Sequence, residues 1–146
     1  MADFLQSVCR IGVGLYWLYF ASQKWNGVAW VHPLMVNAGA RNPVPGVHEF
    51  LVQVVTPNWQ LFAVGETAGE TVAGALLVLG LATRWAAVLA VLLALGLSFS
   101  IAFGLPDVGL RWLYYLGVIA SLAIAVNGAG SLALDRLIPV PRWLQS

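Results

Sequence analysis

Four apolar segments, each of about 20 residues, are the feature that most limits how this chain can fold, because a helix of that length crosses the hydrocarbon core of a bilayer. Only 9% of the residues are charged, whereas an ordinary soluble domain carries roughly 25%. We therefore predict an integral membrane protein. Spanning helices are expected over four ranges: Phe4–Gln23, Trp59–Ala82, Trp85–Phe103 and Val108–Asn127.

The connections between these segments differ greatly in length. Gly80 can end the second helix, Thr83 can cap the third and Asp107 can cap the fourth, so these helices follow one another through short turns. The first connection, residues 24–58, is long and contains four prolines, both histidines and only short apolar stretches. The predicted fold is all-α: one domain over residues 1–146, a four-transmembrane-helix bundle with a long loop between helices 1 and 2.

Ionisable side chains within the predicted spans mark the candidate site. Glu66 and Glu70 lie one helical turn apart on the second span. Because the first two helices run antiparallel, Lys24 at the end of the first is expected within reach of Glu66, and we predict that it pairs with Glu66 or Glu70. One lysine facing two buried glutamates predicts that one carboxyl is protonated and can exchange a proton with a substrate. Alternatively, the three groups only neutralise one another and hold the bundle together.

A second pair of charges is expected near the opposite membrane face. Arg10 lies on the first helix, and Asp135 follows the fourth. Paired charges are the usual way in which a protein tolerates buried ionised groups. We therefore predict a structural ion pair that ties the C-terminal segment to the first helix.

Aromatic residues gather toward the membrane face that carries the long loop. Trp25, Trp59 and Trp112 are expected to form flat apolar walls for a ring-shaped ligand, while Lys24 and Arg111 hold negative charge. Part of this bias is also typical of the aromatic belts at membrane interfaces.

Several classes of ligand are not supported by the sequence. Both histidines lie outside the predicted spans, and the single cysteine excludes an internal disulfide or cysteine cluster, so we predict no metal. No glycine-rich phosphate-binding motif is present, so no nucleotide is expected. A formal net charge of +1 gives no reason to expect a nucleic-acid partner.

Three stretches combine charged and small residues in a recognisable pattern. They are Arg10 with Lys24 on the first helix, the run from Glu70 through Gly74, Gly80 and Thr83 to Arg84, and the run from Gly128 to Asp135. This pattern resembles the signature positions of the DoxX/DoxD family. The loop dipeptides lean toward the DoxD side, the membrane subunit of thiosulfate:quinone oxidoreductase; they are Asn42-Pro43, Pro45-Gly46 and Pro57-Asn58. The resemblance implies a four-helix membrane protein that helps electrons from a reduced sulfur compound reach quinone, beside a second subunit.

The leading hypothesis is a membrane subunit of a quinone-linked oxidoreductase that acts on a reduced sulfur compound such as thiosulfate. Glu66 or Glu70 would be the catalytic proton-exchanging residue, and quinone would be a substrate. Two other functions remain open: a non-enzymatic anchor or accessory subunit of a larger complex, and a small proton-coupled transporter. We expect the chain in the plasma membrane, and a small excess of arginines on the terminal side favours cytoplasmic termini.

Overall fold

The structure is a computed structural model, and it describes residues 2–136. These residues form helices joined by turns, with no strand among them. The helices are α1 (Ala2–Ser22), α2 (Val31–Arg41), α3 (Pro45–Phe50), the π-helical η1 (Leu51–Val55), α4 (Trp59–Leu79), α5 (Thr83–Leu97), the π-helical η2 (Ser98–Ala102), α6 (Val108–Asn127) and the 3-10 turn η3 (Leu134–Arg136).

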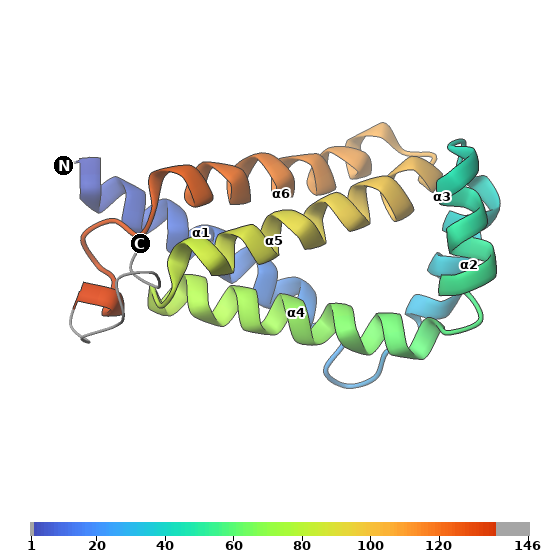
Figure 1. The fold of residues 1–146 in the computed structure, drawn as a ribbon, viewed down its shortest axis with the longest axis horizontal. Helices are drawn as coiled ribbons and strands as arrows, with labels where there is room; N and C mark the ends of the chain where they lie inside the picture. The colour runs from blue at the N-terminus through green and yellow to red at the C-terminus, as the bar shows by residue number, and fades with distance from the viewer. Residues whose placement is uncertain (1, 137–146) are drawn as a thin grey trace.

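The long helices α1, α4, α5 and α6 run side by side along the length of the molecule (Figure 1). Three stretches of the described chain are long and apolar enough to cross a membrane: Trp59–Leu79, Thr83–Ala102 and Val108–Asn127. The all-helical membrane protein expected from the sequence is therefore confirmed. At 21 residues α1 equals α4 in length, but its sequence is more polar, and its crossing of the membrane stays a prediction.

The ends of the long helices lie close to the predicted ends, but one cap differs. Gly80 has a φ of +70° and ends α4 in the left-handed conformation that glycine adopts without strain. Asp107 caps α6 as predicted, since its carboxylate accepts from the N–H of Gly109 at 2.7 Å. Thr83 does not cap α5. Its place is taken by Asp135, which accepts a hydrogen bond from the N–H of Ala82 at 2.9 Å.

The long loop expected between the first two spans is mostly helical. Its apolar stretches form α2, α3 and η1, which lie across one end of the bundle (Figure 1). Each is too short to span a membrane. The helices α2 and η1 bury Val31, Met35, Leu51 and Val55 around Ala63 of α4, and Val47 of α3 is partly buried against the same cluster. Burial of one face is enough to order a short helix against a bundle. We call residues 31–55 the cap.

The core of the bundle is built largely from small residues. Alanines of α5 pack against Leu77 of α4, Trp17 of α1 and Ile124 of α6. Trp17 is fully buried, and its indole N–H donates to Ser121 Oγ of α6 at 3.1 Å. Small side chains let helix backbones approach closely, which is typical of packing inside membranes.

Candidate functional site

The sequence predicts that Lys24 pairs with Glu66 or Glu70, and in the structure it binds both. Its ammonium Nζ lies 2.8 Å from each carboxylate oxygen of Glu70 and also contacts Oε1 of Glu66. Glu70 is fully buried, whereas the Glu66 side chain keeps 16% of its exposure. An ammonium group has three hydrogens to donate, so all of its donors are used within this cluster.

The close approach of α1 to α4 brings these groups together. A Cβ placed on Gly74 would lie 2.9 Å from the carbonyl oxygen of Gly14, and one placed on Gly14 would be equally crowded by Gly74. The two backbones therefore touch, and only glycine fits at either position. This contact brings the end of α1 beside α4, where Glu66 and Glu70 occupy one face of the helix.

The charge cluster lies at the depth of the middle of α4. Glu70 follows Trp59 by eleven residues and precedes Leu79 by nine. At 1.5 Å per residue it is about 16 Å from one end of the helix and about 14 Å from the other. Because α4 is long and apolar enough to span a bilayer, a membrane centred on this helix would place the cluster far from either surface.

A cavity of about 350 Å³ reaches the cluster through Glu66. Its walls come from α4, α5, η2 and the cap, and they are largely aliphatic and aromatic, with Phe62, Leu93 and Met35 among them. Of the described residues around the cavity, Glu66 is the one with a titratable side chain. An apolar cavity with a single carboxyl on its wall suits a neutral ligand that offers one polar group.

The cavity opens on the outer surface of the bundle. Its exposed lining residues are Phe50 of the cap and Leu92 and Gly96 of α5. Leu92 and Gly96 belong to a stretch that is apolar and long enough to span a membrane. Where this stretch crosses a bilayer, the opening faces lipid, which would give a lipid-soluble molecule a direct path to Glu66.

Both π-helical segments of the described chain contribute to the wall of this cavity, η1 through Leu51 and Val55 and η2 through Ser100 and Ile101. Asn42, at the end of α2, is buried, and its Nδ2 donates to the carbonyl oxygen of Phe99 in η2 at 2.7 Å. Short π-helical turns often occur at functional sites. Sequence reasoning missed Asn42 because an Asn-Pro dipeptide is typical of a surface turn.

The predicted tryptophan walls do not surround this cavity. Trp25 donates to Thr71 Oγ1 at 3.0 Å, Trp59 stacks on the His32 ring at 4.8 Å, and Trp112 is more than half exposed. None of the three is among the described residues around the cavity. Trp59 begins α4 and Trp112 lies near the start of α6, which suits membrane anchoring because tryptophan concentrates at the boundary between lipid and water, whereas Trp25 lies beside the middle of α4.

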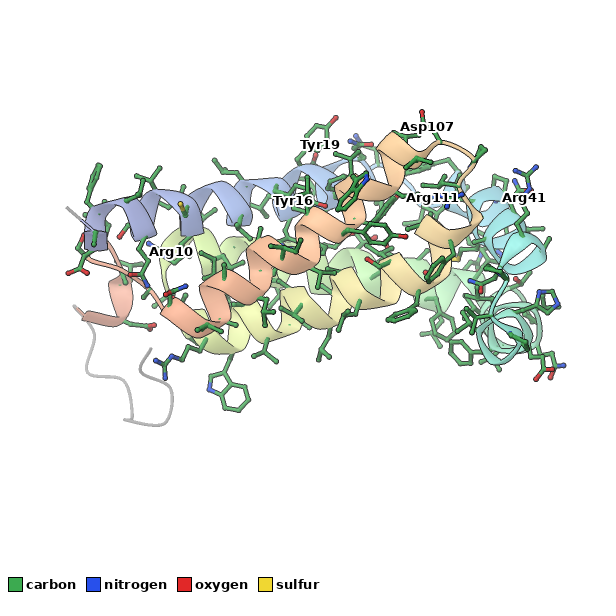
Figure 2. The ribbon with its side chains drawn as sticks, turned by 90° about the horizontal axis from the view of Figure 1, so that it is seen from above. Arg10, Tyr16, Tyr19, Arg41, Asp107 and Arg111 are labelled. Atoms are coloured by element: carbon green, nitrogen blue, oxygen red, sulfur yellow. The ribbon has the colours of Figure 1, made fainter. Side chains whose placement is uncertain are left out.

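Arg111 does not hydrogen-bond to Lys24, Glu66 or Glu70. Its Nε donates to the carbonyl oxygen of Leu105 at 2.8 Å, in the turn that leads into α6. Figure 2 shows Arg10 toward one end of the bundle and Arg111, Arg41 and Asp107 toward the other. Tyr114 of α6 is nearer to the site, since its phenol interacts electrostatically with Glu66, Lys24 and Glu70.

Arg10 and Asp135 hold the opposite end of the bundle through backbone groups. The buried guanidinium of Arg10 donates to the carbonyls of Leu77 and Val78 in α4 and of Ala129 and Leu132 after α6. Asp135 accepts from the N–H groups at the start of α5. The predicted direct ion pair is not among the salt bridges of residues 2–136, which all involve Lys24. Free carbonyls at helix ends compete for the guanidinium, because they need donors as much as Asp135 needs a cation.

Within residues 2–136, no group of three or more histidine, cysteine, aspartate or glutamate side chains is arranged to hold a metal ion. The candidate site consists of the Lys24 cluster and the apolar cavity that Glu66 lines.

The comparisons with known proteins agree with this architecture. No curated protein and no solved structure matches the chain at the significance that we required. The family model described as DoxX matches residues 5–102, which extend from α1 through η2 and include the whole candidate site. These residues are more than half of the chain, and on this ground it belongs to the DoxX family.

Proposed function

We propose that the chain is the membrane subunit of a quinone-linked oxidoreductase and that it binds the quinone ring in the cavity beside Glu66. One observation carries this proposal: a carboxyl group lies on the wall of an apolar cavity that opens toward lipid. A quinone is itself lipid-soluble, and it takes up protons when it is reduced. The site supplies an apolar enclosure and a group that can exchange a proton.

Glu66 is the proton-exchanging residue in this proposal. Its Oε1 contacts Lys24, and its side chain lines the wall of the cavity. Two carboxylates and one ammonium group would carry a net negative charge in a buried site, so a proton held on one carboxyl lowers the cost of burial. On Glu66, that proton lies where it can move to a quinone oxygen as one of the two that reduction consumes, while Glu70 keeps Lys24 in place. The second proton, and the one that restores Glu66, come from the aqueous phase.

The electrons reach the quinone from outside this chain. Reduction of a quinone to a quinol consumes two electrons and two protons, and oxidation of a reduced sulfur compound such as thiosulfate releases electrons. With one cysteine, the chain has no dithiol pair to hold them. We assign the oxidation of the electron donor to a second subunit, in keeping with the DoxD-like dipeptides between α1 and α4.

The proposal includes α1 as a fourth spanning helix. Its length equals that of α4, and it runs along that helix in the bundle. Four spans place both ends of the chain on one side of the plasma membrane, and we assign that side to the cytoplasm.

A matched pair of glycine variants tests the ligand site. Gly96 lines the cavity and Gly65 does not, and a Cβ at either position meets no atom within 4 Å. Leucine at position 96 therefore fills the opening without displacing the backbone. We expect Gly96→Leu to weaken binding of decylubiquinone at least about tenfold, which corresponds to 1.4 kcal/mol, and Gly65→Leu to bind as the wild type does. Calorimetric titration of the detergent-solubilised protein measures this difference.

A second variant separates binding from proton exchange. Glu66→Gln keeps the shape of the side chain but removes the transferable proton, so quinone should still bind while turnover with the partner subunit falls at least about a hundredfold. Equal quinone binding by both glycine variants, together with no turnover in any assembly, would favour the anchor function. Proton uptake by proteoliposomes in the absence of quinone would favour the transporter.

A further inference from the structure

The phenol of Tyr114 lies on the inner face of α6, beside the charge cluster. Tyr114 shares this face with Gly117 and Ser121, which are both buried in the bundle. Its hydroxyl is close enough to interact electrostatically with all three members of the cluster. The described residues around the cavity come from α4, α5, η2 and the cap. Tyr114 of α6 therefore approaches Glu66 from a different side than a ligand in that cavity.

Tyr114 and Glu66 also lie at a similar depth in the bundle. Glu66 follows the first residue of α4 by seven residues, and Tyr114 follows the first residue of α6 by six. At 1.5 Å per residue, both are about 10 Å from the helix ends beside the cap. Figure 2 shows Arg111 and Asp107 at that end of α6. The phenol is therefore one helical turn inside the charged end of α6 and level with Glu66.

A buried hydroxyl without a partner lies near the same level. Ser98 is 6% exposed, and its Oγ makes no hydrogen bond to residues 2–136. It follows Ala94 of the core by one helical turn, so it continues the inner face of α5. Ser98 begins η2, the last helical segment before the turn into α6, and η2 packs against α6. A buried polar atom without a protein partner is the usual place for a bound water.

We propose that Tyr114, together with a water held by Ser98, carries protons from the aqueous phase to Glu66. This inference rests on the proposed function, because the carboxylate needs a new proton each time it has given one to a quinone. In one concerted step, the phenol oxygen takes a proton from the aqueous side and the phenol's own proton moves to the water. The water passes one of its protons to the Glu66 carboxylate. The phenol and the water are unchanged at the end, and one proton has moved from the aqueous phase to Glu66.

Exchange of the carboxyl proton with D2O tests this route without quinone or a partner subunit. The chain alone is placed in nanodiscs and changed from H2O to D2O buffer. Infrared spectroscopy follows the C=O stretching band of the protonated carboxyl group, which shifts when deuterium replaces the proton. The band is assigned by its loss in Glu66→Gln, because this variant leaves one carboxylate for one ammonium group and no proton is needed there.

The variant Tyr114→Phe removes the hydroxyl and keeps the ring, so exchange should slow at least about tenfold. The matched control is Tyr115→Phe, which makes the same change at the next residue of α6. The Tyr115 ring packs edge-on against Trp112, with 5.7 Å between the ring centroids, and this variant should exchange at the wild-type rate. Ser98→Ala should also slow exchange, because the water loses a partner. Formate added to Tyr114→Phe should restore exchange, since its neutral acid can enter where the hydroxyl was.

The results separate this inference from the proposed function. Exchange of the carboxyl proton in Tyr114→Phe as fast as in the wild type would overturn the relay, because another route would then supply the proton. Equal slowing in Tyr115→Phe would overturn it too, since the effect would come from the packing of α6. An unchanged rate in Ser98→Ala would contradict the bound water. Absence of the carboxyl band in the wild type would mean that both glutamates are ionised, which would overturn the proposed function and this inference with it.

Discussion

Lys24 supplies the positive charge that balances the two glutamates inside the bundle. It binds both glutamates of α4, and Glu70 has no exposure to solvent. The sequence was sufficient to predict this contact, because helical periodicity places Glu66 and Glu70 on one face and an antiparallel neighbour brings Lys24 to their level. The sequence could not show whether a tryptophan lines a ligand site or anchors the protein in the membrane, since tryptophan serves both purposes.

Removal of the lysine charge should be more damaging than removal of all three charges. Lys24→Met leaves two carboxylates facing one another in a buried site, which should cost about 3 to 5 kcal/mol of folding free energy. Adding Glu66→Gln and Glu70→Gln should restore more than half of that loss. Unfolding by SDS in mixed micelles measures both effects, with Arg41→Met, an exposed cation of the cap, as the control. A Lys24→Met protein as stable as the control would show that the cluster is hydrated.

At the scale of helices, Arg10 connects elements that are distant in the sequence. Its guanidinium donates to carbonyls at the end of α4 and in the segment after α6, while Asp135 caps α5. The sequence indicated that both charges hold the C-terminal segment, but not that they do so through backbone groups. Side-chain types reveal charges, whereas the carbonyls left free at a helix end depend on where that helix stops.

Arg10→Met should therefore be strongly destabilising. A buried carbonyl that loses its donor costs about 1 to 3 kcal/mol, and four carbonyls share this guanidinium. The bonds to Ala129 and Leu132 connect α1 to the segment after α6, so this segment should become accessible to exchange first. Hydrogen–deuterium exchange with peptide resolution checks this order. Uniform protection of residues 128–136 in the variant would contradict it.

The helices of the cap were harder to predict than the long helices. The spans are long and continuously apolar, so length alone identifies them. Residues 31–55 contain several prolines and only short apolar runs, and their helices depend on burial against Ala63 and on the bond from Asn42 to η2. Tertiary contacts of this kind cannot be derived from local sequence.

For the molecule as a whole, the proposed function predicts a definite topology in the membrane. If α1 crosses the bilayer, both ends of the chain lie on one side, and a fusion of either end to green fluorescent protein should fluoresce in the cytoplasm. Alkaline phosphatase at the same positions should be inactive, while its insertion after Arg41 in the cap should be active. Activity at one terminus only would mean that the chain has an odd number of crossings.

The ammonium group of Lys24 has all its N–H donors engaged by Glu66 and Glu70. This also limits which charged molecules can approach the site. An anion that entered the cavity would meet a carboxyl before it met a cation, and the nearest cation has no N–H left to offer. Thiosulfate carries two negative charges and would be repelled there. We infer that the sulfur compound is oxidised on a different polypeptide and that only neutral molecules from the lipid phase reach the interior of this chain. Inhibition by a neutral quinone analogue, with no competition from sulfate or sulfite, would be the kinetic sign of that separation.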